Sequence, residues 1–308
     1  MKIAHFTDTN RSAIYRLACG ISSPKLECRV ADFHPKKPSP SQVKRVKDLF
    51  RWADIVHVQY WKTGAKIREI FPEWSTKPKI LTHYNPYNLH EEDWSDYQQL
   101  IVVNQTQHKE LPQATLIPLC TDLNFFKFQK GAEDRKVVHM AVNRIEGKKG
   151  ISFVAQACSE LGYQFQLVGR VSKPKYLQEC REIGGKHMNF RENVSEQQLR
   201  QAYYEAGVHV CNSVDGFESG TLPILESMAC GVPVISRNIG HVSDLYTGSN
   251  LKLLTGPPKD VEGIKTALQG IMNDKETTRK MIQEGTSTVG KRDYPTWSMR
   301  HLEVYRNL

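Results

Sequence analysis

Short apolar runs alternate with amphipathic stretches along the whole chain. In the first part, six runs have the length and composition of buried strands: residues 2–7, 28–33, 54–60, 79–82, 100–104 and 115–118. A helix is predicted between two of them, where Val43, Val46, Phe50 and Ala53 recur at helical spacing after the cap-like pair Ser39–Pro40. Strands that alternate with helices predict a parallel α/β sheet.

The same pattern starts again after a change of composition at residues 127–136. Apolar runs at 137–142, 164–169, 208–210, 232–235 and 251–254 predict strands, and residues 151–161 and 261–273 predict helices. The repetition of strand-helix units on both sides of this segment predicts two doubly wound, Rossmann-like domains.

The most informative stretch is Asp215–Ser236. Pro223 suits the first turn of a helix, and Gly231 suits the left-handed residue that closes one. The loop before this helix therefore brings free backbone N–H groups and the positive end of a helix dipole to one point, which favours phosphate or hydroxyl oxygens. Two carboxylates flank that point, Glu218 and Glu226, and the second suits contact with a vicinal diol.

This Glu-x7-Glu pattern, followed by a helix of small residues and Gly231-Val232-Pro233, resembles family 4 of the retaining nucleotide-sugar glycosyltransferases. The resemblance implies the GT-B architecture, in which two Rossmann-like domains face each other across a cleft. It places an acceptor-binding domain at residues 1–128 and a donor-binding domain at 129–293. Residues 294–308 would form a C-terminal helix that crosses back to the first domain.

The resemblance also implies a set of site residues. His83, Arg144, Lys149 and Glu218 match the catalytic positions, with Lys148 as the competing choice for the lysine. Donor binding falls on Ser219, Gly220, Thr221, Leu222 and Glu226, and residues 189–195 would hold the nucleotide base. Ile239–Gly240 is similar to the family's loop behind the donor site.

The reaction implied is a retaining transfer of a hexose or pentose from a UDP- or GDP-linked sugar to a hydroxyl group. No Asp-x-Asp occurs in the chain, so we expect neither a metal nor another cofactor, and Arg144 and Lys149 would neutralise the leaving diphosphate. The resemblance further implies that the leaving group departs and the acceptor attacks on the same face of the sugar, without a protein nucleophile.

Charge points to the nature of the acceptor. Residues 1–90 hold 16 Lys and Arg against 7 Asp and Glu, a net charge of +9 that accounts for the whole excess of the chain. Such a patch attracts anionic carriers, either a lipid-linked or envelope glycan at a membrane or DNA with hydroxymethylated bases. Asn10, Arg11, Tyr84 and Asn85 are the candidate acceptor contacts. Solubility alone would also account for a basic surface.

Two other functions remain open at this stage: a sugar-nucleotide epimerase of the same architecture, and a non-catalytic nucleic-acid-binding protein. We expect a cytoplasmic protein, peripheral to a membrane or associated with DNA, because no signal-peptide pattern or membrane-length apolar run occurs. Seven cysteines without a Cys-x-x-Cys pair indicate neither a zinc site nor a disulfide framework.

Overall fold

The computed structural model describes residues 1–10, 12–85, 89 and 94–308. The chain forms two compact units, which we describe separately. Unit 1 comprises Met1–Cys120 with Arg292–Leu308, and unit 2 comprises Thr121–Lys291. The sequence placed the division after residue 128. The connecting segment joins unit 2 earlier because Phe126 packs against Tyr203 and the Gln129 N–H donates to Cys230 O at 3.2 Å.

Unit 1 contains a parallel sheet with the strand order β2-β1-β3-β4-β5-β6 in the described part of the chain. The strands are β1 (Lys2–Thr7), β2 (Glu27–Asp32), β3 (Ile55–Val58), β4 (Lys79–His83), β5 (Gln99–Val102) and β6 (Thr115–Leu116). The helices are α1 (Ala13–Cys19), α2 (Pro40–Trp52), α3 (Trp61–Ile70), α4 (Gln105–Glu110) and α12 (Tyr294–Arg306). All six predicted strands are present, with ends that differ by a few residues.

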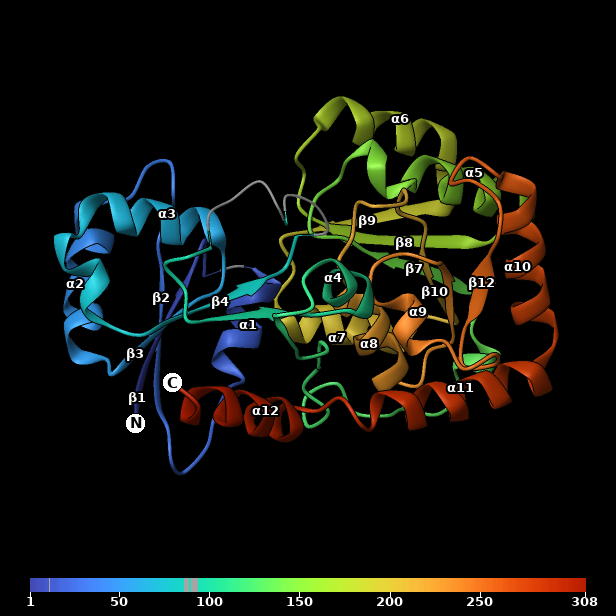
Figure 1. Ribbon diagram of the computed structural model, residues 1–308. Helices are drawn as coiled ribbons and strands as arrows, with labels where there is room; N and C mark the ends of the chain where they lie inside the picture. The colour runs from blue at the N-terminus through green and yellow to red at the C-terminus, as the bar shows by residue number, and fades with distance from the viewer. Residues whose placement is uncertain (11, 86–88, 90–93) are drawn as a thin grey trace. The chain divides into compact units, whose positions relative to one another are not determined.

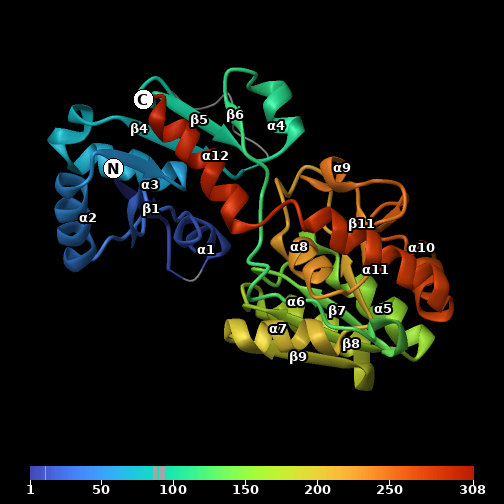
Figure 2. The ribbon, with the colours of Figure 1, turned by 90° about the horizontal axis from the view of Figure 1, so that it is seen from below.

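Local chemistry explains where these helices begin and how α12 is held. The predicted cap of α2 is present: Ser39 Oγ accepts from the Gln42 N–H, and Gln42 Oε1 accepts from the Ser39 N–H. Helix α12 lies against α1 and the sheet (Figure 2), where Trp297 Nε1 donates to Leu17 O and Tyr305 Oη lies 2.7 Å from His57 Nδ1. The end of the chain is therefore part of unit 1.

Unit 2 repeats the design with the strand order β12-β11-β10-β7-β8-β9, again parallel throughout the part described. Its strands are β7 (Val137–Ala141), β8 (Gln164–Gly169), β9 (Met188–Glu192), β10 (Val208–Cys211), β11 (Val234–Arg237) and β12 (Lys252–Leu254). The helices are α5 (Ile151–Leu161), α6 (Pro174–Gly184), α7 (Glu196–Glu205), α8 (Leu222–Ala229), α9 (Val242–Leu245), α10 (Val261–Asn273) and α11 (Lys275–Val289).

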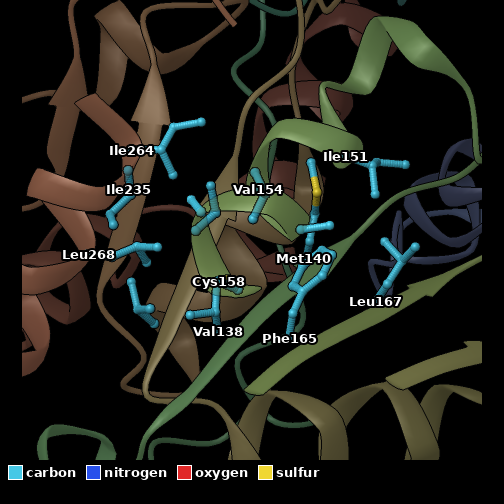
Figure 3. Packing of buried hydrophobic residues seen from close by; sticks show 14 of the residues in the cluster. Val138, Met140, Ile151, Val154, Cys158, Phe165, Leu167, Ile235, Ile264 and Leu268 are labelled. Atoms are coloured by element: carbon cyan, nitrogen blue, oxygen red, sulfur yellow. The ribbon is translucent and has the colours of Figure 1, made fainter. Parts of the chain in front are cut away.

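The core of unit 2 follows from the alternation of side chains along its strands. Val138 and Met140 of β7 point to one face, where they pack with residues of α5, α6 and α10 (Figures 1 and 3). His139, between them, points to the other face and packs edge-on against Tyr203 of α7, with ring centroids 4.8 Å apart. Both faces of the sheet are therefore covered, so a ligand can reach the sheet only at the ends of its strands.

The predicted base-binding segment, residues 189–195, begins in the edge strand β9 and continues into the turn after it. The turn after this strand contains Asn193, whose φ of 52° is left-handed. Among the described residues, no helix is long and apolar enough to cross a membrane.

Candidate donor and acceptor sites

The helix predicted from Pro223 and Gly231 is α8, which packs against α11 and against strands β10 and β11. Thr221 is its N-cap, Pro223 lies in its first turn, and Gly231, with a φ of 75°, follows its C-cap. The strand order places β7 next to β10. The loop after β7, which carries Arg144 and Lys149, therefore meets the loop between β10 and α8, which carries Glu218.

Lys149 and Glu218 are in direct contact. Lys149 Nζ donates to Glu218 Oε1, and the two side chains are only 7% and 13% exposed. The ring of Phe217 lies against Lys149 and the neighbouring Lys148, with their Nζ atoms 4.9 and 5.0 Å from its centroid. Lys149 is thus the buried lysine of the pair, whereas Lys148 is exposed.

Besides Lys149, a second side chain contacts the carboxylate of Glu218. Ser213 Oγ donates to Glu218 Oε1 at 3.0 Å, and Ser213 is buried at 2% exposure. Sequence reasoning missed this serine because nothing in its local pattern marks it. Arg144 lies on the same loop as Lys149 and is exposed, so its guanidinium is accessible to an anion.

The backbone around Ser219 is closely packed. Gly240, with a φ of 53°, approaches so closely that a Cβ there would lie 2.7 Å from Ser219 C and 2.8 Å from Glu218 O. This loop, predicted to lie behind the donor site, therefore supports the Glu218–Ser219 peptide. Nearby, the Thr221 N–H donates to Nε2 of the buried His241 at 3.3 Å. That N–H was expected to be available for donor oxygens, and the structure gives it a protein acceptor.

Glu226 lies on α8 but is almost fully buried, at 1% exposure. Its Oε2 accepts a hydrogen bond of 2.7 Å from the Tyr203 hydroxyl. Ser219 and Leu222 are also buried, whereas Gly220 is half-buried. The first acid and the lysine of the predicted set are thus brought together, and the second acid is held separately by Tyr203 of α7.

In unit 1, His83 is the last residue of β4 and is buried. Its Nδ1 lies 3.1 Å from Asn85 O, and since a carbonyl oxygen can only accept, the proton must be on Nδ1. Burial lowers the pKa of His83 to about 4, so the ring is neutral at pH 7. Nε2 therefore carries a lone pair, and no described residue is its hydrogen-bond partner.

The remaining acceptor candidates are more dispersed. Tyr84 donates from its hydroxyl to Gln59 Oε1 at 2.8 Å, and Asn85 O accepts from Gln107 Nε2. Asn10 is exposed at the turn after β1, and Arg11 lies outside the described residues. Residues 86–88 and 90–93 lie outside them too, and Trp94 packs edge-on to His83, with centroids 5.3 Å apart.

Comparison with known families shows to which family the chain belongs. The family described as "Glycosyl transferases group 1" matches residues 122–288, which is more than half of the chain and nearly all of unit 2. The chain belongs to the glycosyl transferases group 1 family. Phosphatidyl-myo-inositol mannosyltransferase of Mycolicibacterium smegmatis is 23% identical over 168 residues, a match that covers 53% of this chain and 43% of that protein. The matched part is thus less than half of this relative.

Solved structures extend the likeness to the fold of the whole chain. Sucrose-phosphate synthase (tll1590) of Thermosynechococcus elongatus has a TM-score of 0.78 at 18% identity and covers 100% of this chain and 98% of that one. Anabaena Alr3699/HepE, solved in complex with UDP and glucose, has a TM-score of 0.81 at 14% identity and covers 100% of both chains. These likenesses confirm the predicted fold class, two parallel α/β sheets of the GT-B glycosyltransferase type.

No three His, Cys, Asp or Glu side chains come together to hold a metal ion within the described ranges.

Proposed function

We propose that this group 1 family member is a retaining glycosyltransferase that moves a sugar from a nucleoside diphosphate to a hydroxyl acceptor. The observation that carries the proposal is the buried contact between Lys149 and Glu218, at the carboxyl end of a parallel sheet and just before α8. A cation for a diphosphate and a carboxylate for sugar hydroxyls are the two groups that such a donor needs at the bond that breaks.

Each donor-side residue has a defined role in this proposal. Lys149 and the exposed Arg144 neutralise the charge that grows on the diphosphate as the glycosidic bond breaks. Glu218 accepts hydrogen bonds from the sugar, and Glu226 accepts them from the ribose. Because Glu226 is 1% exposed, we expect α8 or the loop before it to shift when the ribose binds. The Gly220 and Leu222 N–H groups are the backbone donors we assign to donor oxygens, whereas the Thr221 N–H keeps His241 Nε2 as its acceptor.

Retention of configuration follows in this proposal from attack on the face that the diphosphate leaves. A phosphate oxygen accepts the proton of the acceptor hydroxyl, so that no protein nucleophile and no metal ion are needed. Nε2 of His83 can accept a hydrogen bond, since the neutral ring keeps a lone pair on this nitrogen. This histidine would bind a sugar or acceptor hydroxyl, together with contacts from Asn10, Arg11, Tyr84 and Asn85.

The neighbours support a nucleotide-sugar donor. Alr3699/HepE has been solved with UDP and with UDP-glucose, and the Mycolicibacterium relative is named a mannosyltransferase. We therefore propose a UDP- or GDP-linked hexose as the donor.

The acceptor is proposed to sit on an anionic carrier, because the net positive charge of the chain lies in residues 1–90, which belong to unit 1. The mannosyltransferase relative is named for a phosphatidyl-inositol acceptor, which favours a lipid-linked glycan over hydroxymethylated DNA. Binding to vesicles of phosphatidylglycerol and phosphatidylcholine, compared with binding to duplex DNA at increasing salt, separates the two. Salt-sensitive binding to DNA alone would reverse this preference.

The reaction is tested with three single substitutions: Glu218→Ala, Arg144→Ala and Lys149→Ala. We expect each to lower kcat by about 10²–10³-fold, the usual effect of removing one group that stabilises transition-state charge. Lys186→Ala is the control, since Lys186 is an exposed basic residue of unit 2 outside the proposed site. Near-normal turnover in any two of the three variants would refute the assignment. Conversion of the donor without any acceptor would indicate an epimerase instead.

A further inference from the structure

The loop between β10 and α8 opens with three consecutive residues, Asn212, Ser213 and Val214, and each contacts either the loop that carries Lys149 or the side chain of Glu218. Asn212 Nδ2 donates to Gly150 O at 3.2 Å, Ser213 Oγ donates to Glu218 Oε1 at 3.0 Å, and the Val214 N–H donates to Lys148 O at 2.9 Å. The turn that carries Lys149 and the carboxylate of Glu218 are therefore both held by the first residues of this loop. We call this segment, residues 212–214, the crosspiece.

The side-chain amide of Asn212 has a second carbonyl partner. Its Nδ2 also donates to Pro258 O at 2.9 Å, and because both partners are carbonyl oxygens, the amide nitrogen must face them. The side-chain Oδ1 then points away, buried and without a hydrogen-bond partner among the residues described. A buried polar atom without a partner destabilises the fold. Packing alone therefore does not account for an asparagine at this position.

The turn that carries Lys149 packs closely against Asn212. Gly150 has a φ of 61°, and a Cβ on it would lie 2.5 Å from Asn212 O and 2.6 Å from Asn212 Nδ2. With Val214 bonded to Lys148 O, the turn is held on both sides of Lys149. The backbone on both sides of Lys149 is thus held by Asn212 and Val214, whereas the carboxylate of Glu218 is held by Ser213.

We infer that the crosspiece is the positioning device of the donor site, with Asn212 positioning Lys149 for the diphosphate and Ser213 positioning Glu218 for the sugar. The inference rests on the proposed function, since it assigns Lys149 and Glu218 to different parts of the donor. When Lys149 turns to the diphosphate, Ser213 remains bonded to Glu218 and keeps the carboxylate in place.

This division of labour is tested with two variants and two kinds of probe. UDP and GDP carry the diphosphate, and UDP-glucose and GDP-mannose carry a sugar as well. Ser213→Ala should leave the affinity for UDP and GDP unchanged and lower kcat/KM for the sugar nucleotide about tenfold, because a bond to a charged group is lost. Ser213→Thr, which keeps a hydroxyl, should restore most of the activity.

Asn212→Asp should instead weaken the binding of UDP or GDP itself by about tenfold, because a carboxylate cannot donate to Gly150 O. Asn212→Ala serves if the aspartate variant fails to fold, as checked by circular dichroism. The controls are Asn250→Asp and Thr278→Val, buried residues of unit 2 that also donate to backbone carbonyls, Leu245 O and Ile271 O. They should lose stability only.

The outcomes separate the inference from the proposed function. If the wild-type protein binds none of the four nucleotides, the proposed function fails. If it binds them and the crosspiece variants behave like their controls, the function stands and the crosspiece has no positioning role. Equal loss of diphosphate binding and of sugar-dependent activity in both variants would also overturn the assignment of separate tasks.

Discussion

Gly150 provides a sharp test of how the lysine turn is built. We consider Gly150→Ala. Its φ of 61° is left-handed, and an L-residue in that conformation costs roughly 1–2 kcal/mol. The added Cβ would also meet Asn212 O at 2.5 Å. That oxygen is main chain directly after β10, so no rotamer change relieves the contact, and overpacking of this kind costs about 1–3 kcal/mol more.

The chain offers a matched control in Gly162, which follows α5. Its φ is 70°, but a Cβ there would meet no atom within 4 Å. Gly162→Ala therefore carries the conformational cost alone, about 1–2 kcal/mol. The difference between the two variants isolates the contact with Asn212.

Two measurements read this difference. Urea unfolding should show the free energy of unfolding falling by about 2–5 kcal/mol for Gly150→Ala, the sum of the two terms, against about 1–2 kcal/mol for Gly162→Ala. Calorimetric titration with UDP-glucose and GDP-mannose should show weaker binding for Gly150→Ala alone, since its turn carries Lys149. If the two variants match in both stability and affinity, the close approach of Gly150 to Asn212 does not constrain the site.

Three further predictions follow from buried polar groups. Tyr203→Phe removes the donor to Glu226 Oε2 and should lower the free energy of unfolding by about 1–3 kcal/mol and raise the donor KM; unchanged urea unfolding and kinetics would contradict this. Lys149→Met leaves the carboxylate of Glu218 without its cation and should cost about 3–5 kcal/mol, part of which Lys149→Met with Glu218→Gln recovers; no recovery in chemical denaturation would show that the ion pair is not coupled. Acid should destabilise unit 1 as the pH falls from about 6.5 towards 4, because the unfolded chain binds protons that the folded one excludes. The loss should reach up to about 1.4 kcal/mol per pH unit for each of the buried histidines His5, His57 and His301. Denaturant midpoints that stay constant between pH 7 and 5 would argue against the last.

The sign of that pH dependence follows from the direction of the shifts. Burial lowers the pKa of His5 to about 3 and that of His301 to about 4, and it lowers the pKa of His57 well below its usual range. Below pH 6.5 the unfolded chain therefore binds more protons than the folded one, so stability rises with pH across this window and is level above it. Since His301 lies on α12, the same window should weaken the attachment of the C-terminal helix.

Elements with strong periodicity were predictable from the sequence. Helices α5 and α10 have the bounds expected, residues 151–161 and 261–273, because their apolar faces repeat at helical spacing over several turns. Helix α7 was missed because it is polar over most of its length. Its signal was the capping box of Ser195 and Gln198, in which each side chain bonds the backbone of the other residue.

The site was predictable only where one motif carried it. Glu218, Glu226 and the N-terminus of α8 follow from local spacing, and the likeness to a family placed Lys149 on the neighbouring loop. Their partners did not follow. Ser213 and Tyr203 act through contacts that depend on strand order and on how helices cover the sheet, and such long-range contacts leave no local pattern in a single sequence.

We propose above all that unit 2 binds a nucleotide sugar through Lys149 and Glu218. The most direct test is calorimetric titration of the full chain with UDP, GDP, UDP-glucose and GDP-mannose, repeated with Lys149→Ala and Glu218→Ala. We predict that the wild-type protein binds one nucleotide series, that Lys149→Ala weakens binding of both the nucleotide and its sugar conjugate, and that Glu218→Ala weakens only the conjugate. Wild-type binding that neither substitution changes would contradict the account.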